Sequence, residues 1–271
     1  MPHRKSTYPG EIYHIFNRGV DKRKIFLDEQ DYLRFILSLY ILNDKNNKYD
    51  VWSSLKFNKN ETLAILSTTG LPEGPVVTKD KRDCLVDILA FTSMSNHYHL
   101  IIREKIPNGI ALFMQKFGGG YAQYFNGQYK RSGTLFESRY QAVRVKSDVQ
   151  LAHLFNYVHK NQIEIVELGW KTAGVQDERR ALSQLKTYPW TSYHDYVGDI
   201  KFPRITERDF YLDLFDGTNG CRQSVEDWVK FKAQNADLPD HLKKLQNYDI
   251  ASLVSRTKTI ESSGDPVVSS V

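Results

Sequence analysis

The sequence is poor in cysteine and has no long apolar run, and each lack excludes a class of protein. Its 271 residues include only two cysteines, Cys84 and Cys221, far apart in the chain. Two such cysteines build neither a disulfide framework nor a zinc knuckle. No apolar stretch approaches the roughly 18 residues of a membrane-spanning helix. Residues 1–6 lack the apolar core of a signal peptide, so we expect a cytoplasmic protein that does not enter a membrane.

Charge is unevenly distributed along the chain. The net charge is +5, but the window 103–146 holds eight Lys or Arg residues against two Glu, together with eight Phe or Tyr residues. Cations interleaved with aromatic rings suit a surface that follows phosphates and stacks unpaired bases. The alternative is a helix whose aromatic residues are core and whose lysines are solvated, and we expect this for most of the aromatic residues. The window favours single-stranded over duplex DNA, and it is also compatible with RNA.

The order of predicted elements indicates an α+β fold. Hydrophobic patterns and turn residues predict the following elements: strand 11–17, helix 28–42, strand 85–91, strand 95–103, helix 108–124 and strand 135–145. This split βαβ order is typical of the ferredoxin-like fold, an antiparallel sheet with helices on one face. A turn is expected at 92–94. The glycine run 118–120 indicates that the second helix breaks there or that another chain, such as a DNA backbone, approaches closely.

Two histidines in strand 95–103 are the first candidates for chemistry. Side chains alternate along a strand, so His97 and His99 point to one face while Tyr98, Leu100 and Ile102 point to the other. Two imidazoles side by side form half of a divalent-metal site, and the predicted topology places them on a central strand. His14 is a conceivable third ligand, although we expect it to be a packed structural residue.

A second candidate lies on a helix that begins at a capping box, Ser147 to Gln150. Leu151, Leu154, Phe155 and Val158 form its apolar stripe. His153, Tyr157 and Asn161 follow at intervals of four on an adjacent polar stripe. Taken alone, this pattern leaves open whether Tyr157 is catalytic or is a boundary tyrosine with its hydroxyl in water.

Five separate motifs resemble one protein family. They are Tyr13-His14 with Arg18-Gly19, and the segments 95–100, 131–140, 156–161 and 188–193. In this order and spacing, the chain resembles the single-tyrosine HUH transposases of small bacterial insertion sequences, and particularly the REP-associated tyrosine transposases. The resemblance covers roughly residues 8 to 196. The chain departs from the family in its long 43–83 insertion, its C-terminal extension, and Gln162 at a position where relatives often have proline.

The resemblance implies a role for each matched residue. His97, His99 and Asn161 would hold Mg²⁺ or Mn²⁺, and Tyr157 would be the nucleophile of a single-strand DNA endonuclease and strand transferase. Attack on DNA would form a 5′-phosphotyrosine and release a 3′-OH, splitting the transfer into two reversible steps. The expected substrate is a DNA hairpin with a flanking single strand. Imidazole suits Mn²⁺ better than Mg²⁺, so we expect Mn²⁺ to support at least as much activity.

Further expectations concern partners and organisation. The candidates for phosphate contact are Arg18, Lys22, Arg23, Lys116, Lys130, Arg131, Arg139 and Arg144. We expect residues 1–200 to be the transposase domain, 201–254 a helical extension and 255–271 a disordered tail. The protein would be a monomer or homodimer, associated with the nucleoid of a bacterial cell.

Two other functions remain open on the sequence alone. One is a sequence-specific nucleic-acid-binding protein that keeps the fold but has no turnover, so that Tyr157→Phe would be silent. The other is a zinc hydrolase that uses His97, His99 and either His153 or His159. It would contain zinc and form no covalent adduct with DNA.

Overall fold

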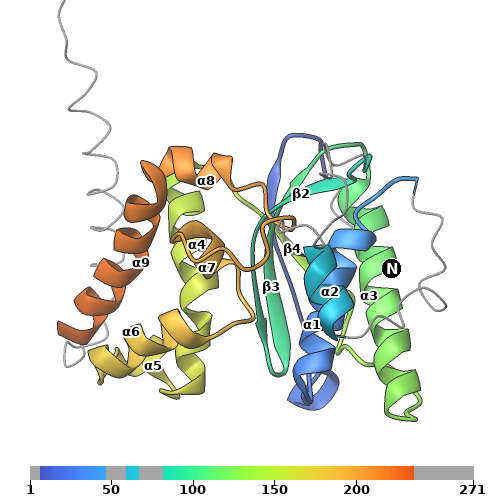
Figure 1. The fold of residues 1–271 in the computed structure, drawn as a ribbon, viewed down its shortest axis with the longest axis horizontal. Coiled ribbons are helices and arrows are strands. Elements are labelled where there is room, and N and C mark those ends of the chain that lie inside the picture. Colours follow the sequence, from blue (N-terminus) through green and yellow to red (C-terminus); the bar gives the residue numbers. More distant parts are fainter. Residues whose placement is uncertain (1–6, 47–58, 67–81, 235–271) are drawn as a thin grey trace, which may run out of the picture.

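The computed structural model describes residues 7–46, 59–66 and 82–234. In these residues the chain forms a four-stranded antiparallel sheet in the order β2-β3-β1-β4 (Figure 1). The strands are β1 (Ile12–Arg18), β2 (Val86–Met94), β3 (His97–Glu104) and β4 (Gln141–Arg144). This order, with α1 (Glu29–Ile41) after β1 and α3 (Gly109–Gln128) after β3, is the predicted α+β arrangement, and it places β3 inside the sheet.

The register of the sheet separates its two faces. Phe16 pairs with His99 and Ile15 with Leu100, so neighbouring residues on β1 and β3 share a face. Tyr98 and Leu100 are buried in an apolar core with α1 and α3, as the alternation predicts. His97 and His99 therefore point to the opposite face, away from that core.

The β2–β3 hairpin turns later than predicted. Thr92 pairs with His99 and Met94 pairs with His97, so the residues predicted to turn belong to the strand. The loop is only Ser95 and Asn96, and Ser95 O accepts hydrogen bonds from the backbone N–H groups of Ile25 and Phe26. These bonds hold the hairpin loop against the β1–α1 connection. This is a tertiary contact, so the turn preferences of residues 92–94 could not predict it.

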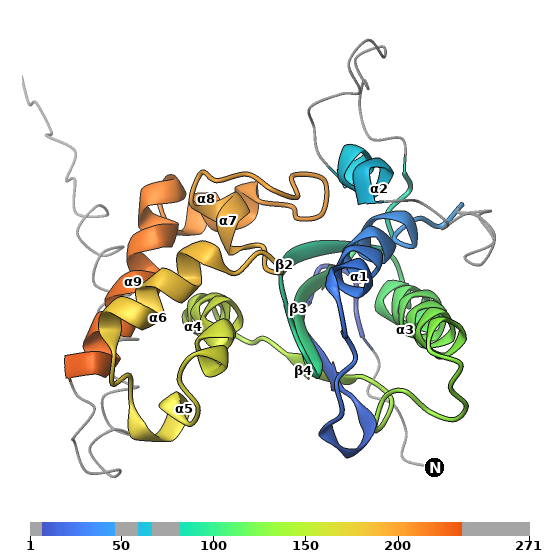
Figure 2. The ribbon, with the colours of Figure 1, turned by 60° about the horizontal axis from the view of Figure 1, so that its bottom comes forward.

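Helices cover both faces of the sheet (Figure 2). On one face, α1 and α3 bury the aromatic residues Phe113, Phe117, Tyr121 and Phe125, which confirms a core role for them. The short α2 (Lys59–Leu66) packs on α1; the rest of the predicted 43–83 insertion lies largely outside the described residues.

The second face carries the helices that follow β4, which the prediction of helices on one face did not include. They are α4 (Asp148–Lys160), α5 (Trp170–Ala173), α6 (Glu178–Thr187), α7 (Tyr193–Tyr196), α8 (Asp209–Leu214) and α9 (Gly217–Gln234), with a 3-10 turn at Asn161–Ile165 after α4. A second apolar core joins Phe155 of α4 to Tyr211, Val225 and Trp228 of α8 and α9. The described part of the C-terminal extension is thus helical and packed, while 255–271 lies outside the described residues.

The last strand is shorter than predicted. β4 spans only Gln141–Arg144, and its four residues are exposed. Residues 135–140 are irregular, although Phe136 makes an isolated bridge to Gly19. Within the described ranges, no helix is both long enough and apolar enough to cross a membrane.

The glycine run does not break its helix. α3 continues through residues 118–120, and a Cβ added at Gly118 or Gly119 would meet no atom within 4 Å. Of the two predicted alternatives, the helix break is therefore wrong. No part of the described protein approaches these two positions closely, and the approach of a DNA backbone stays a prediction.

We expect Gly119→Ala to raise the free energy of unfolding by about 0.5–1 kcal/mol, because glycine in a helix interior is disfavoured by that amount. Urea denaturation measures the change. Gly109→Ala is the matched control: its Cβ would lie 2.3 Å from Leu85 O, so this variant should be less stable. A less stable Gly119→Ala protein would contradict the prediction.

A buried histidine in the second core makes stability depend on pH. His159 Nε2 lies 2.8 Å from Ser192 Oγ, and burial, followed by the nearby His194, lowers the pKa of His159 from 6.5 to about 3. The unfolded chain therefore takes up this proton at a higher pH than the folded chain does. The contribution of His159 to the free energy of unfolding is therefore fully present above about pH 6.5. It falls by about 1.4 kcal/mol per pH unit as the pH drops below that value.

We expect urea denaturation at pH 7 and pH 5.5 to show this loss, and His159→Gln to reduce it by about 1 kcal/mol. An equal loss in the wild-type and His159→Gln proteins would assign the pH dependence to other groups.

Candidate active site

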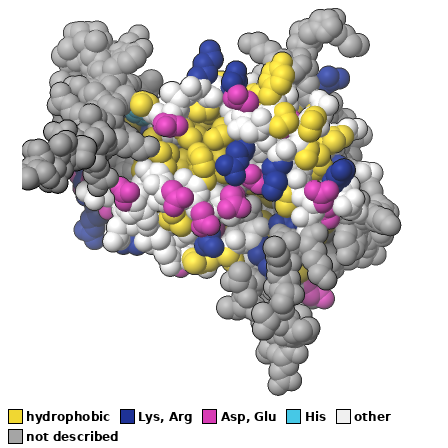
Figure 3. Space-filling model, turned by 90° about the horizontal axis from the view of Figure 1, so that it is seen from above, with side chains coloured by type: hydrophobic (Ala, Val, Ile, Leu, Met, Phe, Trp, Pro, Cys, Tyr) yellow, Lys and Arg dark blue, Asp and Glu magenta, His cyan; other side chains and the backbone are white. Residues whose placement is uncertain are grey.

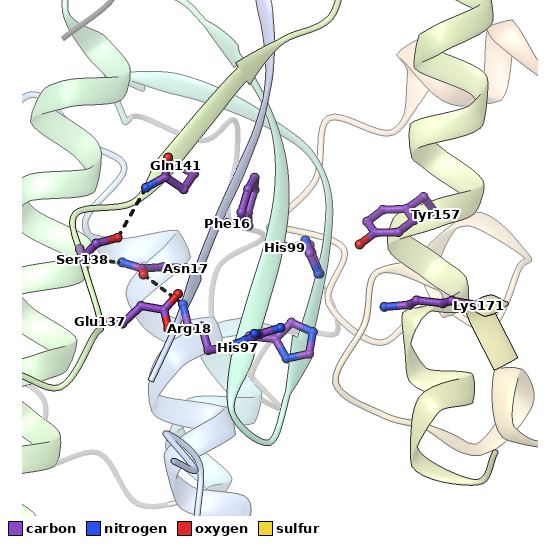
Figure 4. Close-up of a pocket in the computed structure, with 10 residues that line it drawn as sticks. All are labelled: Phe16, Asn17, Arg18, His97, His99, Glu137, Ser138, Gln141, Tyr157 and Lys171. Carbon is purple, nitrogen blue, oxygen red and sulfur yellow. Dashed lines mark hydrogen bonds between the residues drawn. The ribbon is translucent and has the colours of Figure 1, made fainter. Parts of the chain in front are cut away.

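A cavity of about 220 Å³ lies between the sheet and the helices of its second face (Figure 4). It is lined by Phe16, Asn17, Arg18, His97, His99, Glu137, Ser138, Gln141, Tyr157 and Lys171. These residues come from β1, β3, the irregular segment before β4, the start of β4, α4 and α5. The cavity thus brings together His97, His99 and Tyr157, which the sequence separates by about sixty residues.

His97 begins β3 directly after the hairpin loop. Its Nδ1 lies 2.6 Å from Asn96 Oδ1, and Asn96 Nδ2 donates to Lys22 O. Since an amide oxygen only accepts, His97 Nδ1 carries the proton and Nε2 keeps its lone pair. Burial, and then the charges of Arg18 and Lys171, lower the pKa of His97 to about 4. The ring is therefore neutral at pH 7, and the lone pair on Nε2 can bind a cation.

His99 is held by a third histidine. Its Nδ1 lies 2.9 Å from His14 Nε2, and the two rings stack with centroids 5.1 Å apart. Burial lowers the pKa of His14 to about 4 and that of His99 well below its ordinary value. If Nδ1 of His99 donates this bond, its Nε2 lone pair is available to a cation, an arrangement typical of metal-binding histidines.

Tyr157 faces the histidines from α4. Its ring meets His99 edge-on at a centroid distance of 5.4 Å and His14 at 5.9 Å, and its hydroxyl points toward the sheet (Figure 4). Burial raises the pKa of Tyr157, while Asn161 and Arg18 oppose the rise. The phenol is therefore protonated at neutral pH and must lose its proton before or during any attack.

Asn161 is buried and does not line the cavity. It follows α4, and its Nδ2 donates to Tyr157 O at 2.6 Å. Its Oδ1 accepts from Lys171 Nζ at 2.8 Å. The prediction that Asn161 lies on a polar stripe is wrong in this respect. α4 ends at Lys160, Asn161 begins the 3-10 helix, and its side chain is buried and bonded to Lys171 of α5. To act as a metal ligand, its oxygen would have to leave Lys171.

The other histidines weighed as ligands do not reach the cavity. His159 is buried against Ser192 in the second core, and His153 is not among the lining residues. Within the described part of the chain, no group of three or more His, Cys, Asp or Glu residues is placed to hold a metal ion. A zinc site with three histidines therefore lacks its third ligand here.

Of the eight cations predicted to contact phosphate, only Arg18 lines the cavity. Lys116 Nζ donates to Asp44 O, Arg23 pairs with Asp21, and Arg144 pairs with Glu11. On the face seen in Figure 3, basic and acidic side chains are interspersed and do not form a continuous basic stripe. A role for the remaining cations in DNA contact stays a prediction.

Several lining residues were not singled out from the sequence. Glu137 and Ser138 belong to the motif 131–140, which was a usable signal for them. Lys171 had no such signal, because it lies ten residues beyond the motif containing Tyr157 and reaches the cavity only through the fold of α5.

Comparison with known protein families finds a match in the central part of the chain. The family model described as "Transposase IS200 like" matches residues 75–161. The match confirms the predicted family resemblance. This IS200-like region includes β2, β3, α3, β4 and α4, and with them His97, His99, Tyr157 and Asn161. It supports a transposase-like function.

Among solved structures, the chain is similar to one described as "Structure of the REP associates tyrosine transposase bound to a REP hairpin". The identity is 12% and the TM-score 0.42, with 76% of this chain and 94% of that chain covered. No curated protein matches the sequence.

Proposed function

We propose that the protein is a metal-dependent single-strand DNA endonuclease and strand transferase that acts through covalent Tyr157. One observation carries this proposal: the Tyr157 ring lies against His99 in a cavity that also holds His97 and Arg18. A phenol, two neutral imidazoles and a guanidinium are the groups needed for attack on a phosphodiester. The family match over the same residues is consistent with this reaction class.

The donor atoms fit a hard or intermediate divalent cation in part. His97 and His99 would hold Mg²⁺ or Mn²⁺ through Nε2, with open positions left for water and phosphate oxygens. Such a cation supplies charge that polarises the phosphate and orients it. We propose Asn161 as a third ligand only in a state in which its Oδ1 has left Lys171.

The chain's own groups account for the bond changes. Oη of Tyr157 forms a bond to phosphorus as the bond from phosphorus to the 3′ oxygen breaks. The phenol loses one proton and the leaving 3′ oxygen gains one, so the step is balanced and reversible. Arg18 is placed to neutralise charge on the phosphate oxygens. Attack by a 3′-OH on the phosphotyrosine would then join strands.

The substrate we propose is single-stranded DNA that contains a hairpin, as the family resemblance implies. The experiment is to incubate the protein with labelled single-stranded hairpin oligonucleotides and Mn²⁺, and to separate the products on a denaturing gel. Label that stays attached to protein after denaturation would support the proposed covalent step.

Two other outcomes would replace the proposal. DNA that is retarded on a native gel but never becomes attached would indicate a binding protein of this fold without turnover. Cleavage without any covalent intermediate would indicate attack by water.

A further inference from the structure

The cavity contains a second cation that no motif predicts. Lys171 is the second residue of the short helix α5, and its side chain extends toward the histidines beside Tyr157 (Figure 4). Its Nζ lies 5.5 Å from the centroid of the Tyr157 ring. Its charge also contributes to the lowered pKa values of His97 and His99, so it acts at the same place as the imidazoles.

We propose that Lys171 is a catalytic residue that binds the scissile phosphate across the cavity from Arg18, an inference that rests on the proposed function. Both cations line the cavity, and Glu137 is the acidic residue among its lining. The lining therefore carries a net charge of +1, from two cations and one carboxylate, before any metal ion binds. One phosphodiester, which carries a single negative charge, is the complementary ligand.

The fold holds Lys171 in this position. The preceding Trp170 is buried in the second core, where its ring meets Trp228 at a centroid distance of 5.4 Å. Gly169, with φ of 78°, turns the chain into α5. Asn161 then accepts a hydrogen bond from Nζ while its own amide is bonded to Tyr157 O. The same asparagine thus connects Lys171 to the backbone of the proposed nucleophile.

Lys171 keeps donors for a ligand in this arrangement. An ammonium group has three N–H donors, and Asn161 Oδ1 accepts one. Glu164, which also acts on Lys171, lies on the 3-10 turn and is not among the residues lining the cavity. A phosphate oxygen in the cavity can therefore bind Lys171 without displacing Asn161.

The test compares Lys171→Met and Lys171→Arg with Lys186→Met. Lys186 is an exposed lysine of α6 outside the cavity, so its replacement removes the same charge elsewhere. The first readout is binding of a fluorescein-labelled hairpin oligonucleotide, measured by anisotropy in EDTA over a range of NaCl concentrations. Lys171→Met should make the dependence of log K on log[NaCl] shallower by about 0.7, which corresponds to one lost phosphate contact. Lys186→Met should leave the slope unchanged.

The second readout is the rate of covalent adduct formation with Mn²⁺. Lys171→Met should lower it about 100-fold, the usual cost of losing one charge-stabilising donor, and Lys171→Arg should retain most of it. A wild-type slope and rate in Lys171→Met would overturn the proposal. Lys171 would then have only a structural role, as the hydrogen-bond donor to Asn161. If the wild type forms no adduct but Lys171→Met still changes the slope, the proposed reaction fails while phosphate binding by Lys171 stands. Lys171→Glu provides an independent check, since charge reversal should weaken binding further.

Discussion

Tyr157→Phe is expected to lower the rate of covalent DNA attachment by at least about 1,000-fold, because phenylalanine has no oxygen to form the phosphotyrosine bond. The change removes only the hydroxyl and leaves the ring that packs on His99 and His14. DNA affinity should therefore remain close to the wild-type value. Rates are measured from the protein-linked label on denaturing gels, and affinity by anisotropy.

Tyr124→Phe is the matched control for this prediction, because Tyr124 is also partly buried but does not line the cavity. Its hydroxyl donates to Asp31 Oδ1 on the other side of the sheet. Tyr121 is similarly occupied, since its hydroxyl donates to Ile25 O. Adduct formation that survives in Tyr157→Phe would remove Tyr157 from the mechanism.

Removal of the divalent cation is expected to have the second largest effect. EDTA should abolish cleavage, and Mn²⁺ should restore it at least as well as Mg²⁺, since imidazole ligands suit Mn²⁺ better. His97→Ala should weaken Mn²⁺ binding, measured by calorimetry without DNA, by more than about tenfold, and should lower the cleavage rate by about 100-fold or more. The reason is that His97 presents Nε2 while Asn96 occupies its Nδ1.

His153→Ala is the control, because His153 lies on the same helix as Tyr157 but does not line the cavity. It should leave metal affinity and cleavage unchanged. Loss of activity in His153→Ala, together with stimulation by zinc, would instead favour a zinc hydrolase. Full cleavage in EDTA would exclude a metal requirement altogether.

The elements of the sheet and its first core were predictable because they depend on local patterns. Alternation along β3 separates His97 and His99 from Tyr98 and Leu100, and the structure confirms it: Tyr98 and Leu100 pack in the first core, while His97 and His99 line the cavity on the other face. Helical spacing in the same way placed Phe113 and Phe117 in the core. The strand ends were less predictable. The loop at Ser95 and Asn96 is held by the β1–α1 connection, so the position of the turn could not be predicted from residues 92–94.

The sequence by itself determined the fold class, the family resemblance and the facing pair His97 and His99, because side-chain periodicity and motif order are properties of neighbouring residues. Only the tertiary structure decided which groups share the cavity. It placed Tyr157 against His99, paired His14 with His99, buried Asn161 and brought in Lys171. The physical reason is that packing of α4 and α5 on the second face depends on a core completed by α8 and α9, far along the chain. Contacts between residues so far apart in the sequence produce no periodic pattern, so they could not be predicted from the sequence.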